Sequence, residues 1–304
     1  MSRPTQPVPN MQKAPNEAAQ LRRRSQNFKG VSLFLNYALL VALGAFFLFP
    51  LVFMFVSSIK NDELQIMKDM ASANAFIPNG DIGFQNYQDV FARIPFFQAF
   101  FNSLFVVVTT VVLGLGVNSL FAYALARFRF VGRDLLLTLV VSLVIIPFQA
   151  IAVPLLLLVN QFGWLNSYHV QIIPLVANAF SIYLFYQFFI GLPKELEEAA
   201  TVDGASKFRT YWSIMMPLSG PVFATVAILQ FLARWGDLLW PVMTVQGDEF
   251  SPLPLSMQTF FGQAPFNWGD RLAFAAMATL PTLLVFLIFQ RWFVRSAVSS
   301  GVKG

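Results

Sequence analysis

One ionisable pair lies inside an otherwise apolar stretch of the sequence. Of the 15 acidic residues, Asp237 alone falls clearly within such a stretch, and Arg234 precedes it by three positions, on the same face of a helix. Trp235 and Trp240 flank the pair, so this group could bind the hydroxyls of a solute and stack against a sugar ring. The alternative is an ion pair that serves only the packing of a helix within a membrane.

Other residues with chemical potential are sparse. Asn118 and Gln149 also lie in apolar stretches. They would either contact the same solute as Arg234 and Asp237 or connect neighbouring helices. The chain has one histidine, His169, and no cysteine, which leaves little for catalysis or metal binding. The Gly-x-x-x-x-Gly-Lys-Ser/Thr loop that cradles nucleotide phosphates is absent from the sequence. We therefore expect neither an enzyme nor a chain that itself binds ATP, a metal or another cofactor.

The composition places most of the chain in a lipid bilayer. Hydrophobic residues make up 57% of the 304 residues and charged residues only 12%, whereas soluble domains carry about 25% charged residues. A span needs about 20 apolar residues to cross the hydrocarbon core. The sequence thus predicts an all-α membrane protein with six transmembrane helices in one unit, 32–293. The expected spans are 32–58, 97–124, 135–159, 170–191, 217–245 and 272–293, with Pro147 and Pro154 kinking the third.

Basic residues distinguish the two sides of the predicted spans. The loops on one side carry most of the lysines and arginines, whereas the other side has only Lys60, Lys68, Arg93 and Arg271. Because basic loops favour the cytoplasmic side, we expect both termini to be cytoplasmic. The net charge of +5 is then a sign of topology and not of a nucleic-acid partner. The polar ends are expected to be tails: 1–31, disordered for lack of apolar surface, and 294–304.

A charged stretch, 192–216, interrupts the apolar sequence between the fourth and fifth spans. Its early glutamates suit the positive end of a helix dipole, and this first helix would run to about Val202. Gly204 then permits a turn, and Ser206 can cap a second helix that runs to about Met216. Such a helix-turn-helix on the membrane surface could dock a partner. The alternative is an interfacial helix that rests against lipid.

The same stretch resembles the coupling motif of ABC importer permeases. That motif reads Glu-Ala-Ala, three residues, Gly, nine residues, Ile, one residue, Leu-Pro, and this chain keeps its spacing with Met216 in place of the leucine. The resemblance implies that this loop contacts a separate ATPase and passes its movement to the fifth span. The residues it implies for this role are Glu198, Ala199, Ala200, Asp203, Gly204, Ile214 and Pro217.

Further matches extend the resemblance over nearly the whole chain and point to the carbohydrate-uptake type of permease. They lie at 57–60, 63–64, 86–87, 102–103, 122–128, 203–206, 268–269, 290–291 and 301–304. Two departures stand out. The family often has Trp-Asn before the carboxylate in span five, where this chain has Trp235-Gly236-Asp237, and often has Gly-Leu-Thr in its tail, where this chain has 297–300. These departures put an inherited substrate contact and tail contacts with the ATPase in doubt.

The resemblance implies a type I ABC importer permease fold in the cytoplasmic (inner) membrane of a bacterium or archaeon. The implied partners are a second, non-identical permease, two ATPase subunits that would bind ATP and Mg²⁺, and an extracytoplasmic solute-binding protein. The solute would be a sugar, oligosaccharide, polyol, glycerol phosphodiester or glycoside osmolyte. The competing hypothesis is an ion-coupled secondary transporter, which would want several intramembrane carboxylates or histidines, and only Asp237 qualifies.

Overall fold

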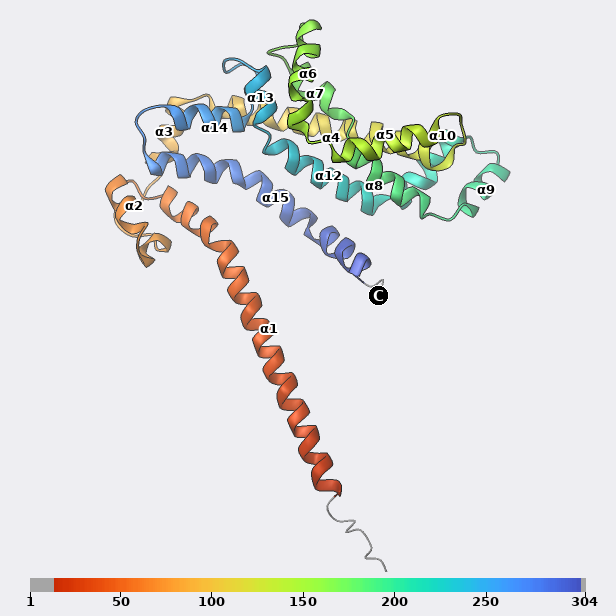
Figure 1. The fold of residues 1–304 in the computed structure, drawn as a ribbon. Coiled ribbons are helices and arrows are strands. Elements are labelled where there is room, and N and C mark those ends of the chain that lie inside the picture. Colours follow the sequence, from red (N-terminus) through yellow and green to blue (C-terminus); the bar gives the residue numbers. More distant parts are fainter. Residues whose placement is uncertain (1–13, 302–304) are drawn as a thin grey trace, which may run out of the picture.

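The computed structural model describes residues 14–301, with side chains described for 33–289, and all regular elements in this part of the chain are helices (Figure 1). The first half forms α1 (Ala14–Ser58), α2 (Glu63–Asp69), the 3-10 helix η1 (Ala73–Phe76), α3 (Gln85–Arg93), α4 (Phe96–Arg127), α5 (Arg133–Ile145) and α6 (Phe148–Gln161). The second half forms α7 (Tyr168–Val176), α8 (Ala179–Ile190), α9 (Glu195–Val202), α10 (Lys207–Thr210), the π-helix η2 (Tyr211–Met215), α11 (Met216–Leu218), α12 (Gly220–Trp235), α13 (Leu239–Thr244), α14 (Leu253–Gly262) and α15 (Trp268–Gly301). The predicted all-α class is confirmed.

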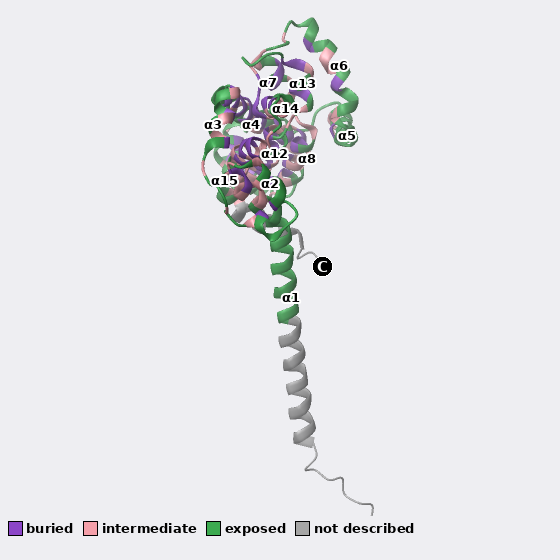
Figure 2. Cartoon of the chain, turned by 90° about the vertical axis from the view of Figure 1, so that its left-hand side faces the viewer, coloured by how far each residue is buried: buried purple, intermediate pink, exposed green. Residues whose placement is uncertain are grey.

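The central helix of the bundle is α4, which contacts α7, α8, α12 and α14. One buried cluster packs its second half against α8, around Tyr123, Phe185 and Phe189. A second cluster packs its first half against α14 and α15, around Phe260 and Phe274. By contrast, α1 extends away from the bundle, and its described residues are mostly exposed (Figures 1 and 2). The core therefore follows α4 from end to end.

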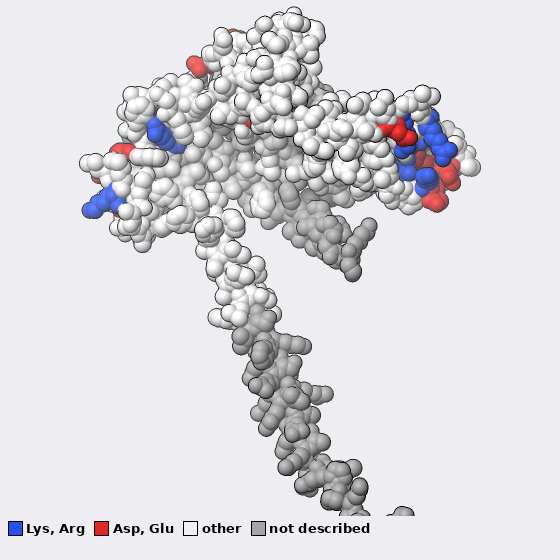
Figure 3. Space-filling model, in the orientation of Figure 1, with Lys and Arg blue, Asp and Glu red and all other residues white. Residues whose placement is uncertain are grey.

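Charged side chains gather at the two ends of the bundle (Figure 3). One group covers α9 and α10, and the other covers α2 and α3, with few charged atoms between them on this face. Helix α4 runs between the two ends with 32 mostly apolar residues. Burying charge in hydrocarbon is costly, so this separation is the one that a membrane-embedded bundle requires.

Four helical segments are long and apolar enough to cross a membrane, namely Leu33–Ser58, Phe96–Arg127, Tyr168–Ile190 and Trp268–Phe289. Two further pairs of helices qualify only when each bent pair is taken together, which would bring the number of crossings in the described residues to six. Tyr168–Ile190 contains a break between α7 and α8 at Ala177 and Asn178. The predicted six spans therefore correspond to four helical segments and two sharply bent pairs.

The predicted third span, 135–159, is bent at Pro147 as predicted, but far more sharply than a kink. Helices α5 and α6 meet at an angle of 109°, with the break at Ile146 and Pro147. Proline cannot donate a helical hydrogen bond, and it pushes the preceding residue out of the helical region. Ile146 accordingly has an extended backbone, with φ −77° and ψ 118°. Pro154, also expected to kink the span, stays inside α6.

The predicted fifth span, 217–245, is divided at both ends. Pro217 belongs to the preceding helical stretch, Lys207–Leu218, which meets α12 at 78°. Helix α12 ends at Trp235 with Gly236 as its C-cap, and the shorter α13 follows. Glycine is unfavourable within a helix because its backbone is conformationally free, so the helix ends here and the chain turns before Leu239.

Helix continues into both regions predicted as tails. Helix α1 begins at Ala14, within the predicted tail 1–31. Ala, Glu, Gln, Leu and Arg, which are frequent in 14–31, are strong helix formers, and the apolar span supplies a helix for them to extend. At the other end α15 continues to Gly301, past the expected boundary at 293. Residues 1–13 and 302–304, which complete the predicted tails, lie outside the described residues.

The segment between α1 and α4, which lies between the first two predicted spans, is built around a buried ion pair. Nζ of Lys60 lies 2.7 Å from Oδ2 of Asp69 and donates a second hydrogen bond, 2.9 Å long, to the carbonyl of Asn74. Lys60 is fully buried. The hydrogen bond from Lys60 lowers the pKa of Asp69 below its ordinary value of 3.8. These contacts fix α2 and η1 onto the end of α1.

The segment 246–270, between the last two predicted spans, is also structured. It contains α14, which packs on α4 and α15 and buries Leu253 and Phe260. Asn102 of α4 donates to the carbonyls of Glu249 and Ser251 at 2.9 and 3.1 Å. This segment is therefore part of the bundle.

Candidate functional site

The helix-turn-helix segment, residues 195–218, has the local structure that its sequence predicts. Helix α9 ends at Val202, and Gly204 adopts a φ of +78° in the turn that follows. Side chains rarely tolerate that left-handed conformation, whereas glycine does. The hydroxyl of Ser206 then accepts a hydrogen bond from the backbone N–H of Arg209 at 3.3 Å, which caps the second helix. Both the turn and the cap are confirmed.

The second helix of this segment is anchored to the bundle by two buried side chains. Tyr211 and Met215 are 1% and 0% exposed and join the core cluster around α4 and α8. The hydroxyl of Tyr211 lies 2.7 Å from that of Ser119 on α4, in hydrogen-bond contact. Both anchors belong to the π-helical turn η2. Such turns in longer helices often mark functional positions, and here the turn ties the segment to the central helix.

The opposite face of the segment presents apolar surface at the end of the bundle. Val202, Phe208 and Trp212 are 87%, 65% and 56% exposed. The rings of Phe208 and Trp212 are stacked, with centroids 6.4 Å apart and an angle of 12° between their planes. Exposed apolar patches of this kind mark interaction surfaces.

The motif residues divide between these two faces. Ala200 is buried and Ile214 is half-buried, so both belong to the packing of the segment. The remaining residues of the predicted set are exposed on its surface: Glu198, Ala199, Asp203, Gly204 and Pro217.

A buried ion pair joins the start of the segment to the end of α4. Nε of Arg127 lies 2.6 Å from Oε1 of Glu197, and these side chains are 4% and 9% exposed. Arg127 also donates to the carbonyl of Leu192 at 2.8 Å, and the hydroxyl of Tyr123 lies 3.4 Å from the other carboxylate oxygen. This ion pair was not predicted. The family resemblance includes Arg127 but implies no partner for it, and the sequence indicates Glu197 only as a favourable negative charge near the start of a helix.

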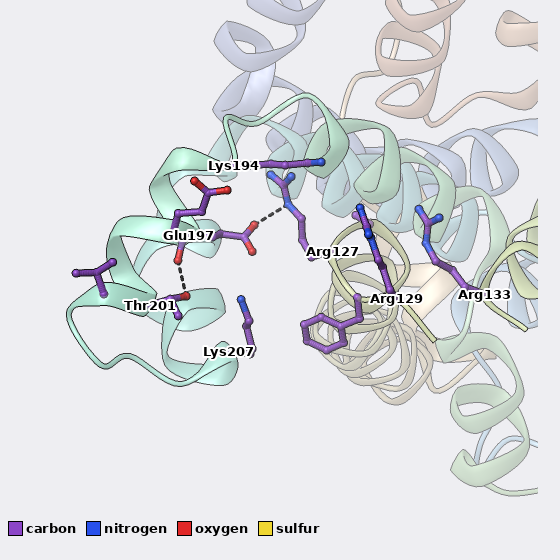
Figure 4. A pocket seen from close by; sticks show the side chains of 11 residues that line it. Arg127, Arg129, Arg133, Lys194, Glu197, Thr201 and Lys207 are labelled. Carbon is purple, nitrogen blue, oxygen red and sulfur yellow. Dashed lines mark hydrogen bonds and ion pairs between the residues drawn. The ribbon is translucent and has the colours of Figure 1, made fainter. Parts of the chain in front are cut away.

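A basic cleft of about 670 Å³ opens beside this ion pair (Figure 4). Its charged lining comes from two parts of the chain. Lys194, Lys207 and two glutamates lie on the helix-turn-helix side, and Arg129 and Arg133 lie on the side of the α4–α5 turn. The charged residues that line it are Arg127, Arg129, Arg133, Lys194, Lys207, Glu197 and Glu198.

The predicted intramembrane pair is present. Nη1 of Arg234 lies 3.0 Å from Oδ2 of Asp237, and the two side chains are 21% and 17% exposed. The other carboxylate oxygen accepts a hydrogen bond of 3.4 Å from the backbone N–H of Trp240. Both residues border a small cavity of about 20 Å³, which Ser103 and Gln171 also line.

The two flanking tryptophans are buried, contrary to the expectation that they offer a platform for a sugar ring. Trp240 is 0% exposed, donates from its indole N–H to the carbonyl of Val170 at 2.8 Å, and packs edge-on against Phe148. Trp235 is 7% exposed, donates to the carbonyl of Ala278 and stacks on Phe231. In this conformation both rings are used within the chain.

Residues 118–298 match the family described as binding-protein-dependent transport system inner membrane component. The chain belongs to this family. Like its named relatives, it is a membrane permease subunit and not an enzyme.

Several relatives of this permease have named transport systems. The arabinooligosaccharides transport system permease proteins AraQ of Halalkalibacterium halodurans and Bacillus subtilis are 34% and 30% identical, over 72% and 86% of this chain and 79% and 92% of their own. The sn-glycerol-3-phosphate transport system permease protein UgpE of Yersinia enterocolitica is 30% identical over 90% of this chain and 99% of its own. A crystal structure of a bacterial ABC transporter for the acidic polysaccharide alginate has a TM-score of 0.75 at 25% identity, over 89% of this chain and 98% of that one.

In this permease Asn118 connects helices. Its amide is buried, donates to the carbonyl of Val176 at 2.9 Å and accepts from the backbone N–H of Asn178 at 2.9 Å. It thereby satisfies the backbone at the break between α7 and α8. Gln149, the other predicted polar candidate, is exposed on α6.

The same region contains polar residues that the sequence reasoning missed. Asn178 accepts hydrogen bonds from the N–H and hydroxyl of Ser181, and that hydroxyl accepts from the amide of Gln230 on α12 at 3.0 Å. Gly114 on α4 lies against Gln230, where an added Cβ would be 2.7 Å from the amide oxygen. Asn178 and Gln230 could have been predicted in the same way as Asn118, because each is a polar residue within an apolar span.

Proposed function

We propose that this chain forms half of the pathway of an ATP-driven, binding-protein-dependent importer, and that the helix-turn-helix segment couples it to an ATPase. The observation that carries this proposal is the division of the segment into two faces. Tyr211 and Met215 are buried against the bundle, whereas Val202, Phe208 and Trp212 are exposed at its charged end. A coupling element needs both a firm attachment to the moving helices and a free surface for the partner.

Coupling through this segment has a direct route into the bundle. Lys207–Leu218 meets α12 at 78° and is joined to it directly, so a displacement of the segment would tilt α12. The segment is also joined to α4 through Tyr211 and Ser119. ATP and Mg²⁺ would bind to the partner subunits, and their closure can drive transport only if they bind the inward-facing and outward-facing states with different affinity.

The proposed solute is a carbohydrate or a related polyhydroxylated compound. The relatives named above belong to transport systems for arabinooligosaccharides and sn-glycerol-3-phosphate, and the matching structure is of a transporter involved in alginate import. Within this chain, Arg234 and Asp237 are the proposed polar contacts, because they combine a donor and an acceptor inside the bundle. The proposed partners are a second, non-identical permease, two ATPase subunits and a solute-binding protein. The proposed location is the cytoplasmic membrane of a bacterium or archaeon, with both termini in the cytoplasm.

The proposal is tested by uptake of radiolabelled solutes in cells with the intact chain or Gly204→Pro. Proline cannot adopt the φ of +78° at this position and removes the N–H that donates to Thr201. We expect loss of uptake and of ATPase co-purification, with the chain still in the membrane. The panel should include arabinooligosaccharides, sn-glycerol-3-phosphate, alginate oligosaccharides, other sugars and polyols, so that the wild-type result identifies the solute.

Gly163→Pro is the matched control. Gly163 also has a positive φ, +68°, and its N–H also donates to a carbonyl three residues earlier, that of Asn160. It lies between α6 and α7 and outside the helix-turn-helix segment. ATPase association should therefore survive this change. Normal uptake by Gly204→Pro without an attached ATPase would contradict the proposal and favour an ion-coupled secondary transporter.

A further inference from the structure

We propose that the basic cleft beside the helix-turn-helix segment binds the phosphate of an anionic phospholipid. This inference goes beyond the transport function and does not depend on the solute that is carried. The cleft has a volume of about 670 Å³ and lies between the α4–α5 turn and the helix-turn-helix segment. Its charge favours an anion, and its position and the apolar surface next to it favour a lipid over a soluble anion.

The charge balance of the cleft favours an anionic ligand. Its lining includes five cations and two carboxylates. Arg127 is neutralised by Glu197, and Arg133 lies 3.1 Å from the exposed carboxylate of Asp134. Among the residues that the structure describes, the remaining cations Arg129, Lys194 and Lys207 have no ion-pair partner and are exposed. Glu198 is the one carboxylate of this lining outside an ion pair in the described part of the chain.

The position of the cleft along the bundle suits a lipid headgroup. Arg127 is the last residue of α4, which is apolar over its length, and Arg133 is the first residue of α5, which is apolar as well. The cleft therefore opens where the apolar part of the bundle meets its charged end. Figure 3 shows the charged side chains gathered at that end. Basic pockets between membrane helices at this depth are suited to phosphate headgroups.

An apolar strip for the acyl chains begins next to the cleft. Leu135, Leu139 and Leu143 of α5 are 65%, 50% and 51% exposed. Their spacing of four residues places them on one face of the helix. This strip starts two residues after Arg133, which lines the cleft. A phospholipid can use both surfaces at once, with its phosphate in the cleft and its acyl chains along α5, whereas inorganic phosphate can use only the first.

A lipid in this place would connect two parts of the molecule. Arg129 belongs to the turn after α4, whereas Lys194 and Lys207 belong to the loop before α9 and to the start of α10. A phosphate between these cations would hold the helix-turn-helix segment near the end of the central helix. The lipid composition of the membrane would then influence the position of this segment.

Native mass spectrometry of the assembled importer, with its ATPase subunits present, tests this site directly. The complex is equilibrated with phosphatidylglycerol or phosphatidylcholine, and the retained lipid is counted. We expect the intact protein to retain phosphatidylglycerol preferentially. The double variant Arg129→Gln/Lys207→Gln should lower that retention roughly tenfold or more, because each basic side chain near a membrane surface contributes a factor of about five.

Two further variants keep the test specific. Lys68→Gln/Arg209→Gln removes two exposed basic residues outside the cleft, one of them on the same short helix as Lys207, and should leave retention unchanged. Arg129→Lys/Lys207→Arg preserves the charge and should retain the lipid, which separates loss of charge from misfolding.

Three results would overturn the proposal. The first is equal retention of phosphatidylglycerol by the Arg129→Gln/Lys207→Gln variant. The second is complete displacement of the lipid by millimolar inorganic phosphate, which would identify a soluble anion as the ligand. The third is retention only after the ATPase subunits are removed, which would assign the cleft to an acidic segment of that partner.

Discussion

Nε of Arg127 lies 2.6 Å from Oε1 of Glu197, and this ion pair joins the last residue of α4 to the first turn of α9. Both side chains are almost enclosed, at 4% and 9% exposure. Arg127 also donates a hydrogen bond to the carbonyl of Leu192, so it holds the chain on both sides of Lys194. The central helix of the bundle thereby determines where the helix-turn-helix segment begins.

Glu197→Gln should loosen the attachment of α9 to α4. The change leaves the charge of Arg127 buried without a counterion, a situation that costs about 3–5 kcal/mol. We expect uptake to fall strongly while the chain still inserts into the membrane. Limited trypsin digestion of membranes is the measurement, because Lys194 and Lys207 flank α9 and should be cut faster in the variant.

Glu195→Gln is the control for that experiment, since Glu195 lies in the same first turn but is exposed. It should change neither uptake nor the rate of cleavage after Lys207, a tryptic site that Glu195 does not adjoin. The double variant Arg127→Met/Glu197→Leu should recover part of the stability, because it removes both charges together. Equal digestion of Glu197→Gln and the intact protein would show that the ion pair does not hold the segment.

Gly114→Ala should destabilise the middle of the bundle. An added Cβ would lie 2.7 Å from the amide oxygen of Gln230 and 3.2 Å from the carbonyl of Val176. Gln230 is 8% exposed and hydrogen-bonded to Ser181, so it has little freedom to move aside. Overpacking of this kind costs about 1–3 kcal/mol, and the melting temperature of the purified protein should fall.

Gly116→Ala on the same helix supplies the matched control. Apart from the surrounding turns of its own helix, no heavy atom lies within 4 Å of a Cβ added there. Alanine is favoured over glycine in a helix by roughly 0.5–1 kcal/mol, so this change should leave the melting temperature unchanged or raise it. The close approach at Gly114 would be refuted by equal melting of the two variants.

The sequence was informative where a local signal decides the structure. Gly204 and Ser206 occupy the turn and cap predicted for them, because a left-handed backbone and an N-cap each select particular residue types. The apolar runs likewise located the helices. Their breaks were harder to predict: proline at 147 indicated a bend, but an angle of 109° depends on how α5 and α6 pack on other parts of the bundle.

Long-range contacts could not be read from the sequence. The matched positions Lys60, Asn86 and Gly269 looked unrelated, yet the amide of Asn86 donates to the carbonyl of Lys60 at 2.7 Å and lies where a Cβ on Gly269 would be. Nor could burial of Trp240 be foreseen, since tryptophan suits a binding surface and a packed core equally well. Spacing along the chain does not say which helix faces which.

Asp69→Asn should remove an acid-sensitive contribution to stability. The hydrogen bond from Lys60 lowers the pKa of Asp69 in the folded protein below 3.8. A lowered pKa stabilises the fold fully above the unfolded value, and this stabilisation is lost as the pH falls through the folded value. We therefore expect the melting temperature of the intact protein to fall more steeply below about pH 4 than that of the variant.

The variant should also melt at a lower temperature near neutral pH, since Lys60 would then be buried without a counterion. Asp81→Asn, at an exposed position in the same segment, should keep the pH profile of the intact protein. Identical acid profiles for Asp69→Asn and the intact protein would refute this assignment of the acid-sensitive step.

Asp237→Asn separates a pathway contact from a packing contact. If the carboxylate that lies 3.0 Å from Arg234 receives solute hydroxyls, its loss should raise the KM for uptake about tenfold or more, since a hydrogen bond to a charged group contributes about 1.5–3 kcal/mol. Trp240→Phe provides the contrast. It leaves the carbonyl of Val170 without its indole donor and should lower stability by about 1–3 kcal/mol, with the KM unchanged because the ring is fully buried. A higher KM in Trp240→Phe and an unchanged KM in Asp237→Asn would contradict this. They would show that the Trp240 ring contacts the solute and that the Arg234–Asp237 ion pair serves only helix packing.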